Sequence, residues 1–264
     1  MKVNDIIDVM ENIAPPFLKE DYDNVGLMVG SREAEVSKIL IALDATLEVI
    51  EEAKELGAEL IITHHPLLFR KPSSITDDTL LGKKIISLIK NNISLYSSHT
   101  NFDSVKGGLN DKIVELLGFE SKEIMSPVNI NGFNESGLGR VIELNEGISL
   151  EDLNKRIKSS LGVKNLRCVI GSRNPIKKIA IINGSGQDFF SLAYSKNVDC
   201  IITGDTTYHY ASDYREMGVS IMDIGHYGSE WPVFVALSEN IKQKLENKVE
   251  IIISGKTMDP YDFF

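Results

Sequence analysis

Two segments of the chain, 140 residues apart, carry the same strand–helix–strand pattern. "KILIALDATLEVIEEAKELGAELIIT" begins at Lys38, and "KKIAIINGSGQDFFSLAYSKNVDCIIT" begins at Lys177. Each has an apolar run, an amphipathic stretch and a second apolar run, which is typical of a βαβ unit with parallel strands. The identical pairs are Lys38/Lys178, Ile39/Ile179, Ile41/Ile181, Ala53/Ala193, Ile61/Ile201, Ile62/Ile202 and Thr63/Thr203. Any two βαβ units share some of this likeness, so the identical pairs alone do not establish an internal repeat. The segments that follow the two units provide a further comparison.

Both units are followed by histidine and carboxylate residues. His64-His65 and then "HTNFD", with His99 and Asp103, follow the first unit. "GDTTYH" and then "HYGSE", with His226 and Glu230, follow the second. Residues 70–82 are about the size of the insertion that the two spacings require. We therefore predict an α/β fold of two related three-layer halves, with polar residues at the C-terminal ends of the strands, where ligands bind in open α/β sheets.

The remaining pattern completes this alternation. Helices are expected over 4–13, 46–57, 79–92, 107–118, 149–162 and 231–246, and further strands over 38–44, 59–63, 93–97, 139–144, 166–170 and 249–254. Gly57 suits a helix C-terminus and Ser149 an N-cap. The stretch "SPVNINGFNESGLG" (126–139) is rich in turn-forming residues. It predicts a boundary between a first domain, residues 1–125 plus 230–264, and a second domain, residues 126–229.

Charge and cysteine content narrow the function classes. The net charge of −10 argues against nucleic-acid binding by bulk electrostatics. The first residues lack the apolar core of a signal peptide, and no apolar run has the length of a membrane span. Cys168 and Cys200 both lie in apolar runs, so we expect buried free thiols rather than disulfides or zinc ligands. These features predict a cytoplasmic protein that does not bind membranes.

All five histidines, at positions 64, 65, 99, 209 and 226, fall in segments that follow strands. With Asp103, Asp205 and Glu230 nearby in sequence, they form a donor set that suits Zn, Mn, Fe or Co. In an extended chain, successive side chains point to opposite sides. The geometry of an extended backbone therefore predicts that His64 and His65 diverge and serve one ion each of a two-metal site.

The pairs His99/Asp103 and His226/Glu230 have i, i+4 spacing, which places each pair on one face of a helix. Structural explanations remain open for the same residues. The histidine doublet would also suit a solvated turn, Asp103 and Glu230 a helix N-terminus, and Asp205 an N-cap, while His209 suits a structural role. "INGSGQD" (182–188) would present backbone amides to a phosphate, although a plain tight turn explains it better.

Six motifs together resemble the NIF-three-like dinuclear metal-centre family, also described as GTP cyclohydrolase I type 2 homologues. They are "DNVGLMVG" (23–30), "IALDAT" (41–46), "THHPLLF" (63–69), "SSHTNFD" (97–103), "TGD" (203–205) and "GHYGSE" (225–230). The resemblance covers nearly the whole chain. Tyr22 stands where many members have tryptophan, and residues 126–139 are too few for the extra domain that some members carry.

The resemblance implies a homohexamer with two divalent ions per chain in the cleft between its domains. It assigns the metal ligands to His64, His65, Asp103, His226 and Glu230, and leaves His99 and Asp205 to orient ligands or contact substrate. It implies a metal-dependent hydrolase, of cyclohydrolase or phosphoesterase type, acting on a nucleotide-like or phosphoester small molecule. The alternative is a hexamer that stores metal or acts as a scaffold without catalysis.

Overall fold

The computed structural model describes residues 1–263, which divide into two compact units. Unit 1 consists of Met1–Val105 and Leu237–Met258, and unit 2 consists of Lys106–Ala236 together with the residues from Asp259 onward. The chain therefore leaves unit 1 earlier than the predicted boundary at 125/126. The reason lies in unit 2, where the helix that follows Lys106 packs against two strands of the second sheet.

Unit 1 contains a five-stranded sheet in the order β1-β4-β3-β2-β11. Only β1 is antiparallel to its neighbour, and the other pairs are parallel. The strands are β1 (Gly26–Val29), β2 (Lys38–Ala42), β3 (Leu60–Thr63), β4 (Ser94–Ser97) and β11 (Glu250–Ile253). The helices are α1 (Val3–Ile13), the 3-10 turn η1 (Pro16–Leu18), α2 (Leu47–Leu56), α3 (Leu80–Lys90) and α4 (Thr100–Ser104).

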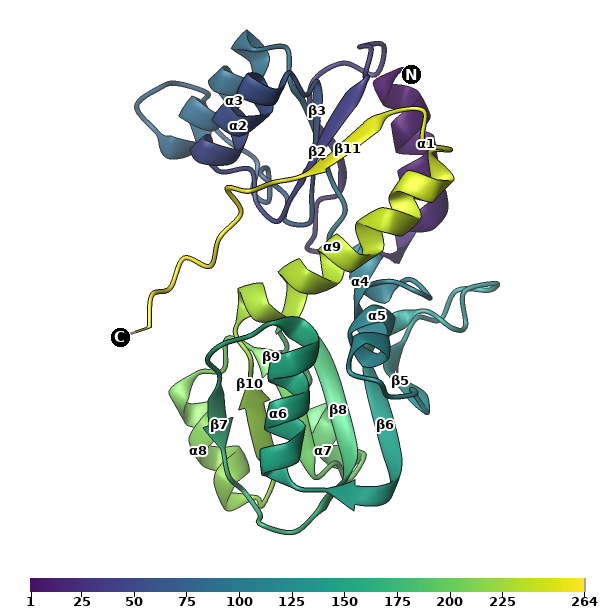
Figure 1. The fold of residues 1–264 in the computed structure, drawn as a ribbon, viewed down its shortest axis with the longest axis vertical. Coiled ribbons are helices and arrows are strands. Elements are labelled where there is room, and N and C mark those ends of the chain that lie inside the picture. The colour runs from purple at the N-terminus through teal and green to yellow at the C-terminus, as the bar shows by residue number, and fades with distance from the viewer. Residues whose placement is uncertain (264) are drawn as a thin grey trace. The chain divides into compact units, whose positions relative to one another are not determined.

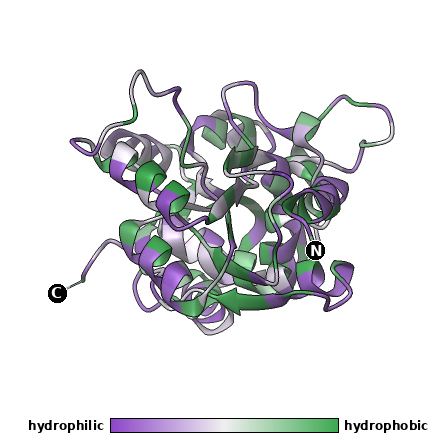
Figure 2. Cartoon of the chain, turned by 90° about the horizontal axis from the view of Figure 1, so that it is seen from above, coloured by the Kyte–Doolittle hydropathy of each residue, from purple (hydrophilic) through white to green (hydrophobic). Residues whose placement is uncertain are grey.

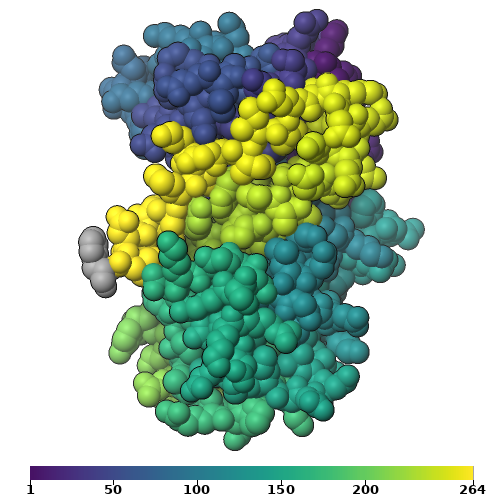
Figure 3. Space-filling model, in the orientation of Figure 1, coloured from purple at the N-terminus to yellow at the C-terminus, as the bar shows by residue number. Residues whose placement is uncertain are grey.

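Helices cover both faces of this sheet (Figure 1). On one face, Val49 of α2 and Ile85 of α3 pack with Leu40 and Ile61 of the strands in one buried cluster. Local signals set the ends of α2: the Thr46 side chain accepts a hydrogen bond from the Val49 amide, and Gly57 takes the left-handed conformation. Figure 3 shows the yellow C-terminal segment of unit 1 packed on the blue N-terminal part.

Unit 2 contains a six-stranded sheet in the order β5-β6-β8-β9-β10-β7, with β8, β9 and β10 parallel. The strands are β5 (Glu123–Pro127), β6 (Gly137–Ile148), β7 (Arg167–Val169), β8 (Ile176–Ser185), β9 (Cys200–Gly204) and β10 (Ser220–Asp223). The helices are α5 (Leu109–Leu116), α6 (Leu150–Leu161), the 3-10 turn η2 (Gln187–Phe189), α7 (Phe190–Ser195), α8 (Tyr208–Glu216) and the first part of α9 (His226–Lys244), whose residues from Leu237 onward belong to unit 1.

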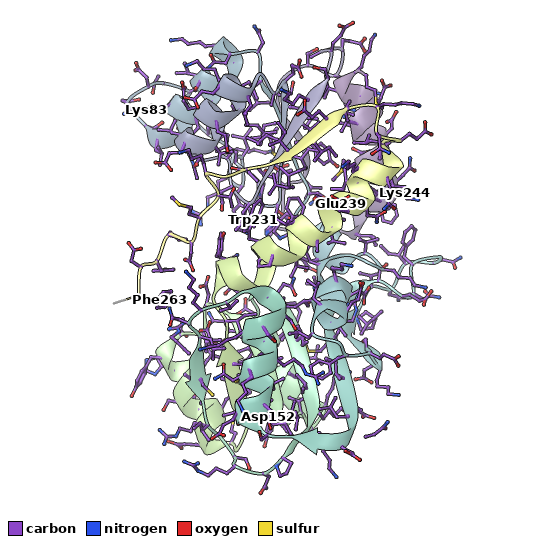
Figure 4. All side chains as sticks on the ribbon, in the orientation of Figure 1. Lys83, Asp152, Trp231, Glu239, Lys244 and Phe263 are labelled. Carbon is purple, nitrogen blue, oxygen red and sulfur yellow. The ribbon has the colours of Figure 1, made fainter. Side chains whose placement is uncertain are left out.

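Two helix layers enclose this second sheet as well. Phe190 of α7 and Tyr214 of α8 pack with Ala180 and Ile201 in one buried cluster. Helix α6 crosses the other face (Figure 1), and Ser149 caps it by accepting a hydrogen bond from the Asp152 amide, the residue labelled in Figure 4. Figure 2 shows hydrophobic and hydrophilic residues on the same helices, as expected for helices with one buried face.

The strand pairing confirms the internal repeat. Ile39 pairs with Leu60 between β2 and β3, and the residues 140 positions later, Ile179 and Cys200, pair between β8 and β9. The third strands correspond too, because Leu60 pairs with Ser94 of β4 and Cys200 pairs with Ser220 of β10. Both sheets therefore contain the same three-stranded parallel core. The segment between β3 and β4 accounts for the extra residues of unit 1.

Several sequence expectations were incomplete or wrong. The last long helix begins at His226 rather than near 231, and β1, β5 and β10 were given no predicted ranges, whereas the helix expected around His209 is present as α8. Cys168 is exposed rather than buried, because it lies on β7, the edge strand of its sheet, whereas Cys200 is buried as expected. Within residues 1–263, none of the helices combines the length and apolar character needed to cross a membrane.

Candidate metal centre

His64 lies directly after β3 and is fully buried. Its Nδ1 atom is 2.9 Å from the carbonyl oxygen of Ser98, and its Nε2 atom is 3.7 Å from Asp103 Oδ1. Because a carbonyl oxygen only accepts hydrogen bonds, Nδ1 carries the proton in this contact. The neutral ring then presents the Nε2 lone pair toward Asp103, which is the tautomer that binds a metal.

His65 and His99 complete a cluster with His64. A carboxylate oxygen of Asp44 is 3.0 Å from His65 Nδ1, and one of Asp23 is 2.9 Å from His99 Nδ1. The three histidines each offer a ring nitrogen, and these atoms lie within 4.8 Å of one another. His99, expected to orient ligands or contact substrate, therefore lies among the potential ligands themselves.

The extended backbone assumed at His64 and His65 is not observed, and the assignment of one ion to each ring stays a prediction. Their ring centroids are 5.2 Å apart and their ring planes differ by 44°. The prediction assumed extended backbone, but β3 ends at Thr63 and the two histidines form a bend. The Thr63 hydroxyl donates to the His65 carbonyl across this bend.

Asp23 is buried and makes several contacts at the start of α4. Its carboxylate accepts hydrogen bonds from the hydroxyl and the amide of Thr100 and contacts His99. Burial acts to raise the pKa of Asp23, but the hydrogen bond and electrostatic interaction with His99, together with the hydrogen bonds from Thr100, hold that pKa well below its ordinary value. Asp23 therefore stays ionised and fixes the orientation of the His99 ring.

In unit 2, His226 is the first residue of α9 and Glu230 lies one turn later. His226 Nδ1 is 2.7 Å from Asp205 Oδ2, and its Nε2 is 3.1 Å from Glu230 Oε2. The i, i+4 spacing therefore does place both side chains on one helix face, as predicted. The buried Glu230 carboxylate and the anchored imidazole converge on the same region.

Two unusual backbone positions build this part of the site. Asp205 adopts a left-handed conformation with φ of 53°, which is uncommon for a residue with a side chain and is often retained at functional sites. Gly184 has φ of 57°, and a Cβ atom there would lie 2.3 Å from Glu230 Oε1. The Gly184 amide donates to Ser229 Oγ, which fixes the end of β8 against α9.

The structure also shows the roles of the "INGSGQD" turn, His209 and Asp205, for which structural explanations were open. The Gly186 amide is bonded to Thr203 Oγ1 and the Gly184 carbonyl, so "INGSGQD" is a tight turn rather than an open phosphate loop. His209 is exposed on α8. The N-cap of α8 is Thr207, so Asp205 is not the cap of that helix.

Both sets of residues fit divalent metal ions. Four imidazoles each have Nδ1 held by an oxygen acceptor, so Nε2 would be the atom that binds a metal. The carboxylates of Asp103 and Glu230 lie beside two of these Nε2 atoms. Imidazole with carboxylate is a donor set for Zn, Fe, Mn or Co. The chemistry open to such an arrangement is Lewis-acid activation or metal storage.

Sequence reasoning missed three of the oxygen acceptors that hold these histidines. Asp23 and Asp44 stand in two of the motifs quoted above, yet neither had been given a role, and the Ser98 carbonyl leaves no sequence signal. His99 and Asp23 are 76 residues apart, and His65 and Asp44 are 21 apart. An aspartate at a strand end near a histidine segment was the only available signal.

The fold and the site define an α/β protein of two related units that carry histidine–carboxylate clusters at their strand ends. Residues 1–260 match the family described as Duf34/NIF3 (NGG1p interacting factor 3), and the chain belongs to this family. A Clostridium perfringens protein named GTP cyclohydrolase 1 type 2 homolog is 62% identical over 265 residues, with 100% of both chains covered.

A Clostridium acetobutylicum protein with the same name is 51% identical over 266 residues, covering 100% of this chain and 99% of its own. Among solved structures, a Bacillus cereus protein related to NIF3 is 26% identical, with a TM-score of 0.90 and coverage of 100% of this chain and 99% of its own. Both the sequence match and the structural match therefore extend over the whole molecule.

Proposed function

We propose that this chain is a dinuclear divalent-metal protein that hydrolyses a nucleotide-like or phosphoester small molecule. The proposed ligands are His64, His65 and Asp103 of unit 1 and His226 and Glu230 of unit 2. The observation that carries the proposal is the anchoring of each candidate imidazole through Nδ1 by an oxygen acceptor. Purely structural histidines need no common orientation of this kind.

The metals would supply Lewis acidity and activate water as a nucleophile at neutral pH. The protein's own residues prepare this chemistry. Asp44 and Asp205 hold the rings of His65 and His226, and the Ser98 carbonyl fixes the tautomer of buried His64. Asp103 and Glu230 supply the negative charge that offsets a bound cation. Asp205 keeps the orienting role predicted for it.

The names of the relatives make GTP the first substrate to test. In a cyclohydrolase reaction, one water adds at C8 and opens the imidazole ring of guanine, and a second water hydrolyses the resulting formamide to release formate, whereas a phosphoesterase directs water to phosphorus. The same donor set would serve either reaction. We therefore propose the broader class, and the substrate screen decides between its members.

Metal analysis and a substrate screen test the proposal. Reconstituted protein should hold about two transition-metal ions per chain and should turn over GTP or a generic phosphoester. Glu230→Ala should abolish turnover, while Asp213→Ala, which removes an exposed carboxylate on α8, should not. Protein without transition metal after reconstitution would refute the metal site. Full metal content without any turnover would refute the hydrolase and favour storage or a scaffold.

A further inference from the structure

Asn183, near the end of β8, carries a buried carboxamide that the mechanism above does not use. The side chain is 9% exposed, and neither Oδ1 nor Nδ2 has a hydrogen-bond partner among the described residues. An unsatisfied buried polar group costs about 1–3 kcal/mol, and native proteins tolerate few of them. A bound ligand that forms hydrogen bonds with this amide would offset that free-energy cost.

The backbone around Asn183 departs from regular strand geometry. Ile181 pairs with Ile202 of β9, but the next paired residues are Ser185 and Gly204, so β8 bulges over Ile182–Gly184. Bulges often occur next to functional sites, where they redirect a side chain. This bulge includes left-handed Gly184, whose α-carbon faces the Glu230 carboxylate.

Hydrogen bonds fix the bulge from two sides. The Asn183 amide donates to Asn110 Oδ1 of α5 at 3.4 Å, and the Gly184 amide donates to Ser229 Oγ of α9 at 2.9 Å. Ser229 immediately precedes Glu230, so the backbone of Asn183 and Gly184 lies where the first turns of α5 and α9 meet the end of β8. Asn183 is therefore held in place by its main chain while its side-chain amide remains available to a ligand.

We propose that Asn183 Nδ2 donates a hydrogen bond to an oxygen atom of an oxyanion bound at the His226–Glu230 site. This inference rests on the proposed function, because a bound cation is what draws an anion to a site rich in carboxylates. A neutral amide suits the position chemically. It donates to the anion without repelling it, whereas a carboxylate would repel it.

The test uses metal-loaded protein and inorganic phosphate as the probe. Asn183→Leu removes the amide but keeps similar volume. It should weaken phosphate binding about tenfold in calorimetric titration, leave metal content unchanged, and leave the unfolding temperature of metal-free protein equal or higher. Asn154→Leu in α6 is the matched control, since it also removes a buried unpaired amide oxygen. It should leave phosphate binding unchanged.

The outcomes separate this inference from the proposed function. Wild-type protein without metal refutes the proposed function and the inference with it. Normal metal content with no phosphate binding, or with equal phosphate affinity in Asn183→Leu, refutes the inference alone. A lower unfolding temperature combined with lost metal in Asn183→Leu also overturns it, because Asn183 would then be a structural residue.

Discussion

At the scale of single residues, the site depends on which ring nitrogen each histidine exposes. The histidines and the carboxylates one helical turn away were predictable, since their spacing is local. Their oxygen acceptors were not, because chain folding alone brings Asp23 to His99 or Asp44 to His65. The same limit explains why the backbone assumed to be extended at His64 and His65 is instead a bend that carries the hydrogen bond from Thr63 to the His65 carbonyl.

Asp205→Asn separates the charge of this residue from its backbone role. Asparagine tolerates the left-handed conformation, so we expect unchanged stability in urea titrations. Loss of the negative charge next to His226 should weaken metal binding about tenfold in competition with a chelator. Asp205→Ala is the comparison, and should in addition lose about 1 kcal/mol of stability from backbone strain. Equal metal affinity in Asp205→Asn and wild type would contradict the orienting role.

Gly184→Ala should be more damaging than the same change at another left-handed glycine. A Cβ at Gly184 would lie 2.3 Å from Glu230 Oε1, while a Cβ at Gly162 would have open space. Both changes cost about 1–2 kcal/mol of backbone strain. Only Gly184→Ala should also displace Glu230 and lower metal content, as measured by elemental analysis. Equal metal content in the two variants would show that Glu230 is not a ligand.

At the scale of elements, the repeated βαβ unit was predictable because its two halves share apolar periodicity. The strands β1 and β10 were not predicted, and α9 was predicted to begin too late because Gly228 and Pro232 argue against a helix. In both halves, one carboxylate also accepts hydrogen bonds from two successive backbone amides. Glu59 accepts from the amides of Ser37 and Lys38, and Asp199 accepts from those of Lys177 and Lys178.

The hydrogen bonds to the Glu59 carboxylate predict that stability depends on pH. Burial acts to raise the pKa of Glu59, but the amides of Lys38 and Ser37 and the Ser37 hydroxyl outweigh it and lower that pKa below its ordinary 4.5. A lowered folded-state pKa stabilises the protein above pH 4.5, and this contribution is lost as pH falls further. Glu59→Gln should therefore lower the urea midpoint at pH 7, with the difference from wild type shrinking below about pH 4. A constant difference across this range would contradict the assignment.

At the scale of the whole molecule, metal binding and folding should be linked. Ions that bind only the folded chain at a hundred times their dissociation constant would add about 2.7 kcal/mol per site. Chelation should therefore lower the unfolding temperature of the reconstituted protein, followed by circular dichroism. His64→Ala should reduce this shift. An unfolding temperature that chelator leaves unchanged would argue that no metal binds the native state.

The homohexamer implied by the family resemblance is a second prediction at this scale. Sedimentation equilibrium should give six times the chain mass of 29.3 kDa. Comparison of metal-free and metal-loaded samples would show whether assembly needs the ions. A monomer mass at micromolar concentration in both samples would contradict the prediction.

Unit 1 is discontinuous in sequence, so its last strand is synthesised late in translation. Strand β11 pairs with β2 at the edge of the first sheet, yet it is synthesised after all of Lys106–Ala236. During translation, the ribosome therefore releases every strand of the second sheet while β2 still exposes an unpaired edge. A nascent chain that ends before Glu250 should carry all six strands of the second sheet and a first unit that remains sensitive to protease.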